Sequence, residues 1–147
     1  MLAAGGGADG ARAQRLAVTE MQAGASVIAA TREFWGAELG VARRPGDQGR
    51  LTARVAVGEA GGATAVRVGA TAQFLLKPAA RSGTSPYAGV GVAFAGTTGV
   101  RGAGYLVAML GLEAAPGRPR GWYVEVGLEG GVRAAAGLRW RRFRPRR

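Results

Sequence analysis

The sequence predicts an all-β protein built as an antiparallel up-and-down β-barrel of about eight strands. Three observations support this fold class. Apolar residues alternate with small or charged residues in segment after segment from Trp35 to Trp140, and this period of two is typical of strands with two unlike faces. Turn signals separate the segments at short intervals. Thirteen of the 27 glycines lie inside the alternating segments, where they suit close backbone approach in a narrow barrel wall.

Eight segments carry the alternation, and we predict one strand for each. They cover residues 21–30, 34–43, 50–59, 63–76, 87–96, 104–113, 121–129 and 132–143. The first has the weakest contrast between its faces, because Ile28 follows Val27 directly. Pro45-Gly46-Asp47 is a strong turn signal after the second segment. Gly61-Gly62 suits a tight hairpin between the third and the fourth.

The second half of the chain continues the same scheme. The longest connection, 77–86, contains Pro78, Gly83 and Pro86 as breakers. Pro116-Gly117-Arg118-Pro119 separates the sixth segment from the seventh, and Gly130-Gly131 turns the chain into the eighth. In a barrel of eight strands, the longer connections 44–48, 77–86 and 114–120 fall at the same end as both termini.

We divide the chain into an N-terminal segment at 1–20, a barrel domain at 21–143 and a basic tail at 144–147. Ala11-Arg12-Ala13 resembles the small-x-small end of a secretory signal. The charged and apolar regions that should precede it are missing, so it is either the remnant of a signal peptide or a chance match. The chain has no apolar run near the eighteen residues that indicate a spanning helix.

Composition excludes several kinds of chemistry. The chain has no cysteine and no histidine, which excludes disulfides, thiolate nucleophiles, Ser-His-Asp triads and the usual zinc sites. We predict no catalytic residue, no cofactor, no metal ligand and no identifiable small-molecule substrate. The net charge is +11, which permits contact with nucleic acid or an anionic membrane. The arginines are scattered until 139–147, so we expect no nucleic-acid partner.

Alternation alone does not say which face of a barrel points inward. A soluble barrel places its apolar face inside, whereas a membrane barrel turns that face toward lipid. Here the second face carries glycines and isolated charges of both signs instead of the Thr, Lys, Ser and Gln expected of a water-facing sheet. Small residues and a few opposed charges suit a narrow lumen, so the pattern favours a membrane-spanning barrel.

Charges on the second face are therefore candidates for the lumen. They are Glu38, Arg54, Arg67, Glu113, Glu125, Glu129, Arg133 and Arg139, with Arg141 as a further candidate. In a low-dielectric interior they must pair, and we expect Glu125 and Glu129 to face Arg133 and Arg139 across the last hairpin. The alternative is that several of them sit at the wet mouths of the barrel.

Five aromatic residues share the apolar phase and lie near strand ends. They are Trp35, Phe74, Phe94, Trp122 and Trp140. Aromatic residues at the membrane–water interface form girdles around membrane barrels, and we predict that role for these five. The alternative is ordinary core packing in a soluble barrel.

These segments resemble the small outer-membrane β-barrel proteins of Gram-negative bacteria. The resemblance covers about 22–143 and rests on YAGVGVAFAG at 87–96, GYLVAMLGLE at 104–113, GWYVEVGLE at 121–129 and the closing VRAAAGLRWRRF at 132–143. It implies an outer-membrane location, contact with outer-membrane lipid including lipopolysaccharide, and insertion by the outer-membrane assembly machinery. It also makes Phe143 the terminal aromatic of the last strand.

Two function classes remain open at this stage. The first is an integral outer-membrane barrel with a structural or surface-interaction role and no large pore, because eight strands leave an interior just wide enough for side chains. The second is a soluble, lipocalin-like barrel that binds a small apolar ligand among Val66, Val68, Val90, Val92, Leu110 and Val126. A lipid-modifying enzyme is disfavoured, because no serine has a histidine base.

Overall fold

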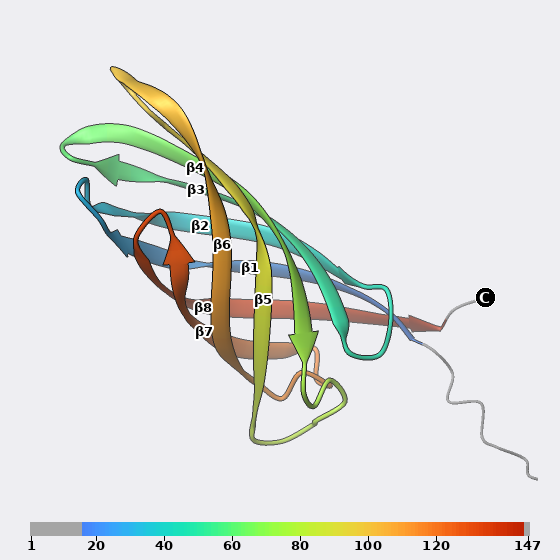
Figure 1. Cartoon of the computed structure of the whole chain (residues 1–147). Coiled ribbons are helices and arrows are strands. Elements are labelled where there is room, and N and C mark those ends of the chain that lie inside the picture. Colours follow the sequence, from blue (N-terminus) through green and yellow to red (C-terminus); the bar gives the residue numbers. More distant parts are fainter. Residues whose placement is uncertain (1–15, 146–147) are drawn as a thin grey trace, which may run out of the picture.

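The protein folds as a closed barrel of eight antiparallel strands (Figure 1). We describe residues 16–145 of a computed structural model. The strands are β1 (Leu16–Ala29), β2 (Phe34–Arg44), β3 (Gly49–Ala60), β4 (Ala63–Leu75), β5 (Thr84–Thr97), β6 (Val100–Ala114), β7 (Arg120–Glu129) and β8 (Val132–Pro145). No helix among the described residues has the length and apolar character needed to cross a membrane.

Each strand pairs with its neighbours in sequence, and β1 pairs with β8 to close the barrel. The closing seam runs from Leu16 opposite Pro145 to Ala29 opposite Val132. This up-and-down topology follows from the short connections, because a two-residue turn can join only antiparallel neighbours. Gly61 and Gly62, with φ of 57° and 82°, form one such turn between β3 and β4.

The predicted strands are all present, but several are longer than predicted. β1 begins at Leu16, five residues before the predicted start, and β8 continues through Pro145, so both boundaries of the predicted barrel domain were too narrow. Leu16, Ala17 and Val18 are consecutive apolar residues and show no alternation. Pairing across the seam nevertheless holds them in the wall. Residues 1–15, which include the predicted signal-like motif, and 146–147 lie outside the described residues.

The two ends of the barrel differ in their connections. Both described chain ends lie at one end (Figure 1), which we call the termini end, together with the connections 45–48, 76–83 and 115–119. The opposite end, which we call the hairpin end, carries the connections 30–33, 61–62, 98–99 and 130–131. The longer connections therefore lie at the termini end, as predicted.

Glycines on the inner face make room for tyrosines. Tyr87 on β5 lies directly opposite Gly111 on β6, and a Cβ at Gly111 would overlap the tyrosine ring. Tyr123 lies opposite Gly137 on β8, and its hydroxyl would be 2.8 Å from a Cβ at Gly24. Small residues on the wall thus allow large side chains to fill the narrow lumen.

Candidate functional site

Side chains alternate between the lumen and the outside along most of each strand, with a register shift between Ala95 and Thr97 on β5. More than half of the buried residues of β1 to β8 are polar or charged, and they include five glutamates: Glu20, Glu38, Glu113, Glu125 and Glu129. The large apolar side chains are on the outside, with Leu106 as much as 82% exposed. The interior of the barrel is therefore polar and its exterior is apolar, the reverse of a soluble barrel.

The structure contradicts the pocket of the soluble alternative. Its six proposed lining residues point outward, and each is at least 42% exposed: Val66, Val68, Val90, Val92, Leu110 and Val126. The five predicted girdle aromatics are also on the outside and exposed. Trp35 and Phe94 lie in the half of their strands nearer the hairpin end, whereas Phe74, Trp122 and Trp140 lie nearer the termini end.

All eight predicted lumen charges face inward, and so does Arg141. Six of them form what we call the hairpin-end cluster: Glu38, Arg54, Arg67, Glu125, Glu129 and Arg133. Arg133 donates to Glu38 at 2.6 Å and to Glu125 at 2.8 Å. Glu129 accepts a hydrogen bond from Arg54 and lies 3.5 Å from Arg67.

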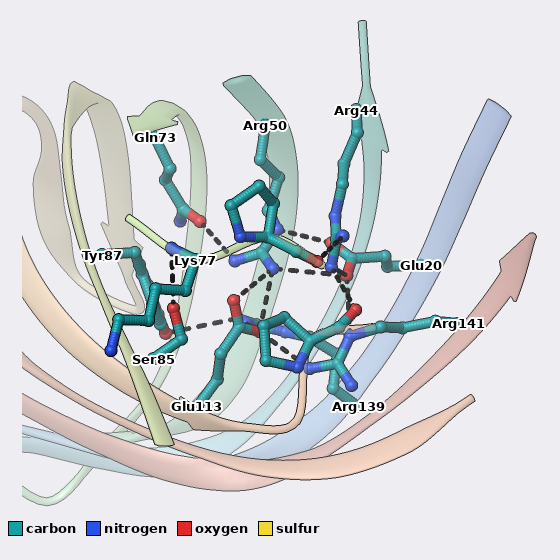
Figure 2. A network of polar contacts seen from close by, with 12 residues as sticks. Glu20, Arg44, Arg50, Gln73, Lys77, Ser85, Tyr87, Glu113, Arg139 and Arg141 are labelled. Atoms are coloured by element: carbon teal, nitrogen blue, oxygen red, sulfur yellow. Dashed lines mark hydrogen bonds and ion pairs between the residues drawn. The ribbon is translucent and has the colours of Figure 1, made fainter. Parts of the chain in front are cut away.

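A second group, the termini-end cluster, consists of Glu20, Arg44, Arg50, Glu113, Arg139 and Arg141. Figure 2 shows it from close by. Glu113 is fully buried and lies 2.7 to 2.8 Å from Arg50, Arg139 and Arg141. Glu20 lies 2.5 to 2.9 Å from Arg50, Arg44 and Arg141. Two carboxylates thus hold four guanidinium groups together.

Two arginines of this cluster also hold the longer connections across the barrel mouth. Arg44 donates to the carbonyl oxygens of Pro78 and Pro116 at 3.1 and 3.0 Å, and Arg141 donates to those of Ala115 and Arg118. The two connections also bond to each other, because the Gly117 amide donates to the Ala80 carbonyl at 2.7 Å. Two of the three connections are therefore held across the termini end of the lumen.

Apolar residues occupy part of the lumen near the hairpin end. Ile28, Phe34, Ala56, Ala60 and Ala65 form a buried cluster contributed by four successive strands. Phe34 and Ile28 are almost completely buried. They explain why Ile28 broke the predicted alternation of the first strand: it is an inward apolar residue at the level where the lumen filling changes from charged to apolar.

Tyr87 connects the two clusters. Its hydroxyl donates to Glu125 at 2.8 Å and accepts from Arg139 at 3.4 Å. The guanidinium carbons of Arg50 and Arg139 lie 5.2 and 5.3 Å from its ring centre, within the range of cation–π attraction. The two clusters therefore form one continuous network along the lumen.

The predicted pairs across the last hairpin form only in part. Arg133 contacts Glu125 closely and Glu129 at 3.8 Å, and Arg139 lies 3.6 Å from Glu125. The shortest partner of Arg139 is instead Glu113 on β6, because pairing crosses the lumen as well as the hairpin. All five lumen carboxylates are paired with arginine, which leaves none of these five poised for acid–base catalysis.

Sequence reasoning missed Glu20, Arg44 and Arg50 as lumen charges. Glu20 lay one residue before the predicted first strand, and Arg44 one residue after the predicted second strand. Extending the alternation would have found both, because Glu20 has the phase of Gln22 and Arg44 that of Ala42. Phe143, which the resemblance made a terminal aromatic, faces inward opposite Val18 and is half-buried.

No protein-family model matches the chain, and neither does any curated protein sequence. Solved structures do match in fold. The N-terminal β-barrel domain of Pseudomonas aeruginosa OprF superposes with a TM-score of 0.67 at 16% identity, covering 86% of this chain and 97% of that one. Neisserial surface protein A gives 0.59 at 14% identity, covering 84% and 96%. The outer membrane protein OprG from Pseudomonas aeruginosa gives 0.62 at 10% identity, covering 85% and 95%. The chain thus has the closed eight-stranded fold of outer-membrane barrels.

Proposed function

We propose that this protein is a small integral barrel of the bacterial outer membrane with a structural or surface-interaction role and no large pore. The observation that carries the proposal is the inverted distribution of side chains. Exposed valine, leucine and aromatic residues surround a lumen filled with paired glutamates and arginines. In water this exterior would be a large unprotected apolar surface, whereas in lipid it is the favoured arrangement.

Closure of the backbone supports the same location. Every strand is hydrogen-bonded on both sides, so the wall has no free edge, and a closed barrel is one of the two structures that can satisfy the backbone inside a bilayer. Aromatic residues toward both ends of the strands suit the two interfaces. The fold shared with outer membrane protein OprG and the other barrels is consistent with this location.

The filled lumen supports a role other than diffusion of solutes. Ion pairs occupy it along much of its length, the connections 76–83 and 115–119 lie across one mouth, and the apolar cluster around Phe34 fills the lumen near the other. We therefore infer that the barrel acts through its outer surface. The partners that suit it are outer-membrane lipid, including lipopolysaccharide, and the assembly machinery that inserts barrels. Catalysis is not part of the proposal.

Fractionation and electrophoresis test the location. Cells expressing the gene with its upstream region are separated into soluble, inner-membrane and outer-membrane fractions. The outer-membrane fraction is then run on SDS gels with and without boiling. We expect recovery in the outer membrane and a band that changes mobility on boiling. A soluble product without a heat-dependent shift would refute the proposal.

Planar bilayer recordings test the closed lumen. We expect the purified barrel to insert without stable, large conductance steps. Steps of the size typical of an open, water-filled pore would show that the ion-pair network does not close the lumen. They would leave the outer-membrane location intact and contradict only the non-conducting part of the proposal.

A further inference from the structure

The charges outside the lumen are distributed very unevenly between the two ends of the barrel. Seven exposed basic residues lie at the termini end: Arg43, Lys77, Arg81, Arg118, Arg120, Arg142 and Arg144. Asp47 is the one exposed acidic residue at this end among residues 16–145. At the hairpin end, Arg32 and Arg101 are balanced by Glu33 and Glu59. The exterior is therefore strongly cationic at one end and neutral at the other.

Part of this charge lies on the lipid-facing phase of strands on one side of the barrel, β7, β8 and β2, with β1 between the last two. Arg43, Arg120 and Arg142 share the outward phase of β2, β7 and β8. Thr19 on β1 lies directly opposite both Arg43 and Arg142, so these two arginines flank one position. Arg120 lies opposite Trp140. We call Arg43, Arg120 and Arg142 the basic arc.

The basic arc begins where the apolar exterior ends. On β8 and β7, the next outward-facing residue toward the middle of the barrel is a tryptophan: Trp140 after Arg142 and Trp122 after Arg120. On β2, Val41 has the same position relative to Arg43. Tryptophans of this kind sit at the headgroup level of a bilayer. The neighbouring guanidinium groups are thus placed to meet lipid phosphates, which arginine recognises through its planar donors.

We propose that the basic arc binds anionic glycerophospholipid headgroups, so that the termini end of the barrel selects phosphatidylglycerol-type lipids from the surrounding leaflet. The proposal rests on the membrane location proposed above and adds the lipid class and the residues that recognise it. The proposal rests on charge complementarity. The arc is cationic, and Asp47 is the one exposed acidic residue at its end of the barrel among residues 16–145, so the arc attracts phosphate and repels choline. Each arginine at an anionic surface contributes about five-fold to affinity.

Tryptophan quenching by brominated lipids tests the proposal. The Trp35→Phe variant retains Trp122 and Trp140, both beside the basic arc, as reporters. It is reconstituted in vesicles of mixed phosphatidylcholine and phosphatidylglycerol, with bromine on the acyl chains of one lipid at a time. We expect phosphatidylglycerol to occupy the neighbourhood of these tryptophans at least five-fold more than its share of the vesicle. The preference should fall in 0.5 M salt.

Matched variants locate the effect. Arg120→Gln with Arg142→Gln removes the two charges of the arc that lie on the strands of the reporter tryptophans, β7 and β8. Arg43 remains, but it lies on β2, two strands away from β8, so we expect the preference near the tryptophans to fall below two-fold. Arg32→Gln with Arg101→Gln removes two charges at the hairpin end and should leave the preference unchanged. Equal quenching by both lipids in the parent, or a preference that survives loss of Arg120 and Arg142, would overturn the proposal. Competition by lipid A is a further test. If lipid A displaces brominated phosphatidylglycerol more effectively than unlabelled phosphatidylglycerol does, the proposal would also be overturned.

The same experiment separates this inference from the proposed function. Quenching by any brominated chain requires that the tryptophans lie in lipid. Absence of quenching by either lipid would contradict the membrane location itself. Equal quenching by both would keep the membrane location and reject only the selective headgroup site.

Discussion

The two charge clusters of the lumen differ in their balance. The hairpin-end cluster contains three glutamates and three arginines, whereas the termini-end cluster contains two glutamates and four arginines. Two arginines of the termini-end cluster have acceptors besides the carboxylates. Arg44 and Arg141 also donate to backbone carbonyls of the connections. The hairpin-end cluster thus fills the lumen with balanced ion pairs. In the termini-end cluster, the arginines in excess also hold the connections across the barrel mouth.

This difference means that the same kind of substitution should have unequal effects in the two clusters. Removing a carboxylate is most harmful where carboxylates are scarce, and removing an arginine is most harmful where arginines are just sufficient. An unpaired buried charge is costly because the lumen supplies little water to solvate it. The following predictions test this asymmetry, beginning with the largest expected effect.

Glu113→Gln should destabilise the barrel most, by about 4 kcal/mol. The change leaves four arginines around a single carboxylate, Glu20. The free energy of unfolding, measured by urea titration of the barrel in lipid vesicles, gives the effect. Glu59→Gln, outside both clusters, is the control and should change stability by less than about 0.5 kcal/mol. A loss for Glu113→Gln no larger than that of the control would contradict the network.

Arg133→Gln should be the next most harmful change, with a loss of about 3 kcal/mol. It removes the shared partner of Glu38 and Glu125 in the balanced cluster. Adding Glu38→Gln, which removes the carboxylate paired with Arg133, restores the charge balance and should recover part of the stability in the same urea titration. A double variant with a lower free energy of unfolding than either single variant would show that charge balance does not control stability.

Tyr87→Phe should cost about 1.5 kcal/mol, because it removes a hydrogen bond to a charged carboxylate. The phenol also joins the two clusters. Stability losses of Glu113→Gln and Arg133→Gln should therefore become more nearly additive in the Tyr87→Phe background. A double-mutant cycle measures this coupling. Tyr105→Phe, which keeps its ring over Arg67, is the control. Equal coupling in the Tyr87→Phe and Tyr105→Phe backgrounds would show that Tyr87 does not link the two clusters.

Arg44→Gln should have the smallest effect on stability among these lumen variants, about 1 kcal/mol. Lost bonds to Glu20, Pro78 and Pro116 are offset by relief of the cationic surplus. The change should instead loosen the connections 76–83 and 115–119, which faster proteolysis within these connections would reveal in vesicles. A stability loss greater than that of Arg133→Gln would reverse the comparison between the clusters.

Much of the wall could be predicted from the sequence, because a period of two assigns every residue of a strand to a face once one residue is assigned. Thus Glu38, Arg67 and Glu129 could be placed in the lumen from their phase alone. Their partners could not be, since contact across a lumen depends on the stagger of all eight strands. Arg133 meets Glu38, which is 95 residues away, and nothing in the local pattern around either residue indicates that contact.

Strand ends were the other limit of prediction. Glu20 and Arg44 belong to strands that continue beyond the visible alternation, and pairing with neighbouring strands extends them. Pro86 read as a breaker, yet it lies within β5 opposite Leu112. Tertiary pairing overrides local signals at such positions. The carbonyl partners of Arg44 were equally hidden, because they belong to irregular connections whose path is set by the barrel mouth.

The seam between β1 and β8 has a consequence for the order of assembly. All the other strand pairs join neighbours in sequence and can zip from a nearby turn, whereas Leu16 and Pro145 must meet from opposite ends of the barrel-forming chain. The entropy of closing so long a loop makes this the slowest contact to form. Until it forms, β1 and β8 each present an unpaired edge that can capture another strand. Before closure the chain is thus an open, curved sheet with two unpaired edge strands. The last step of folding, pairing of β1 with β8, also protects the protein against aggregation.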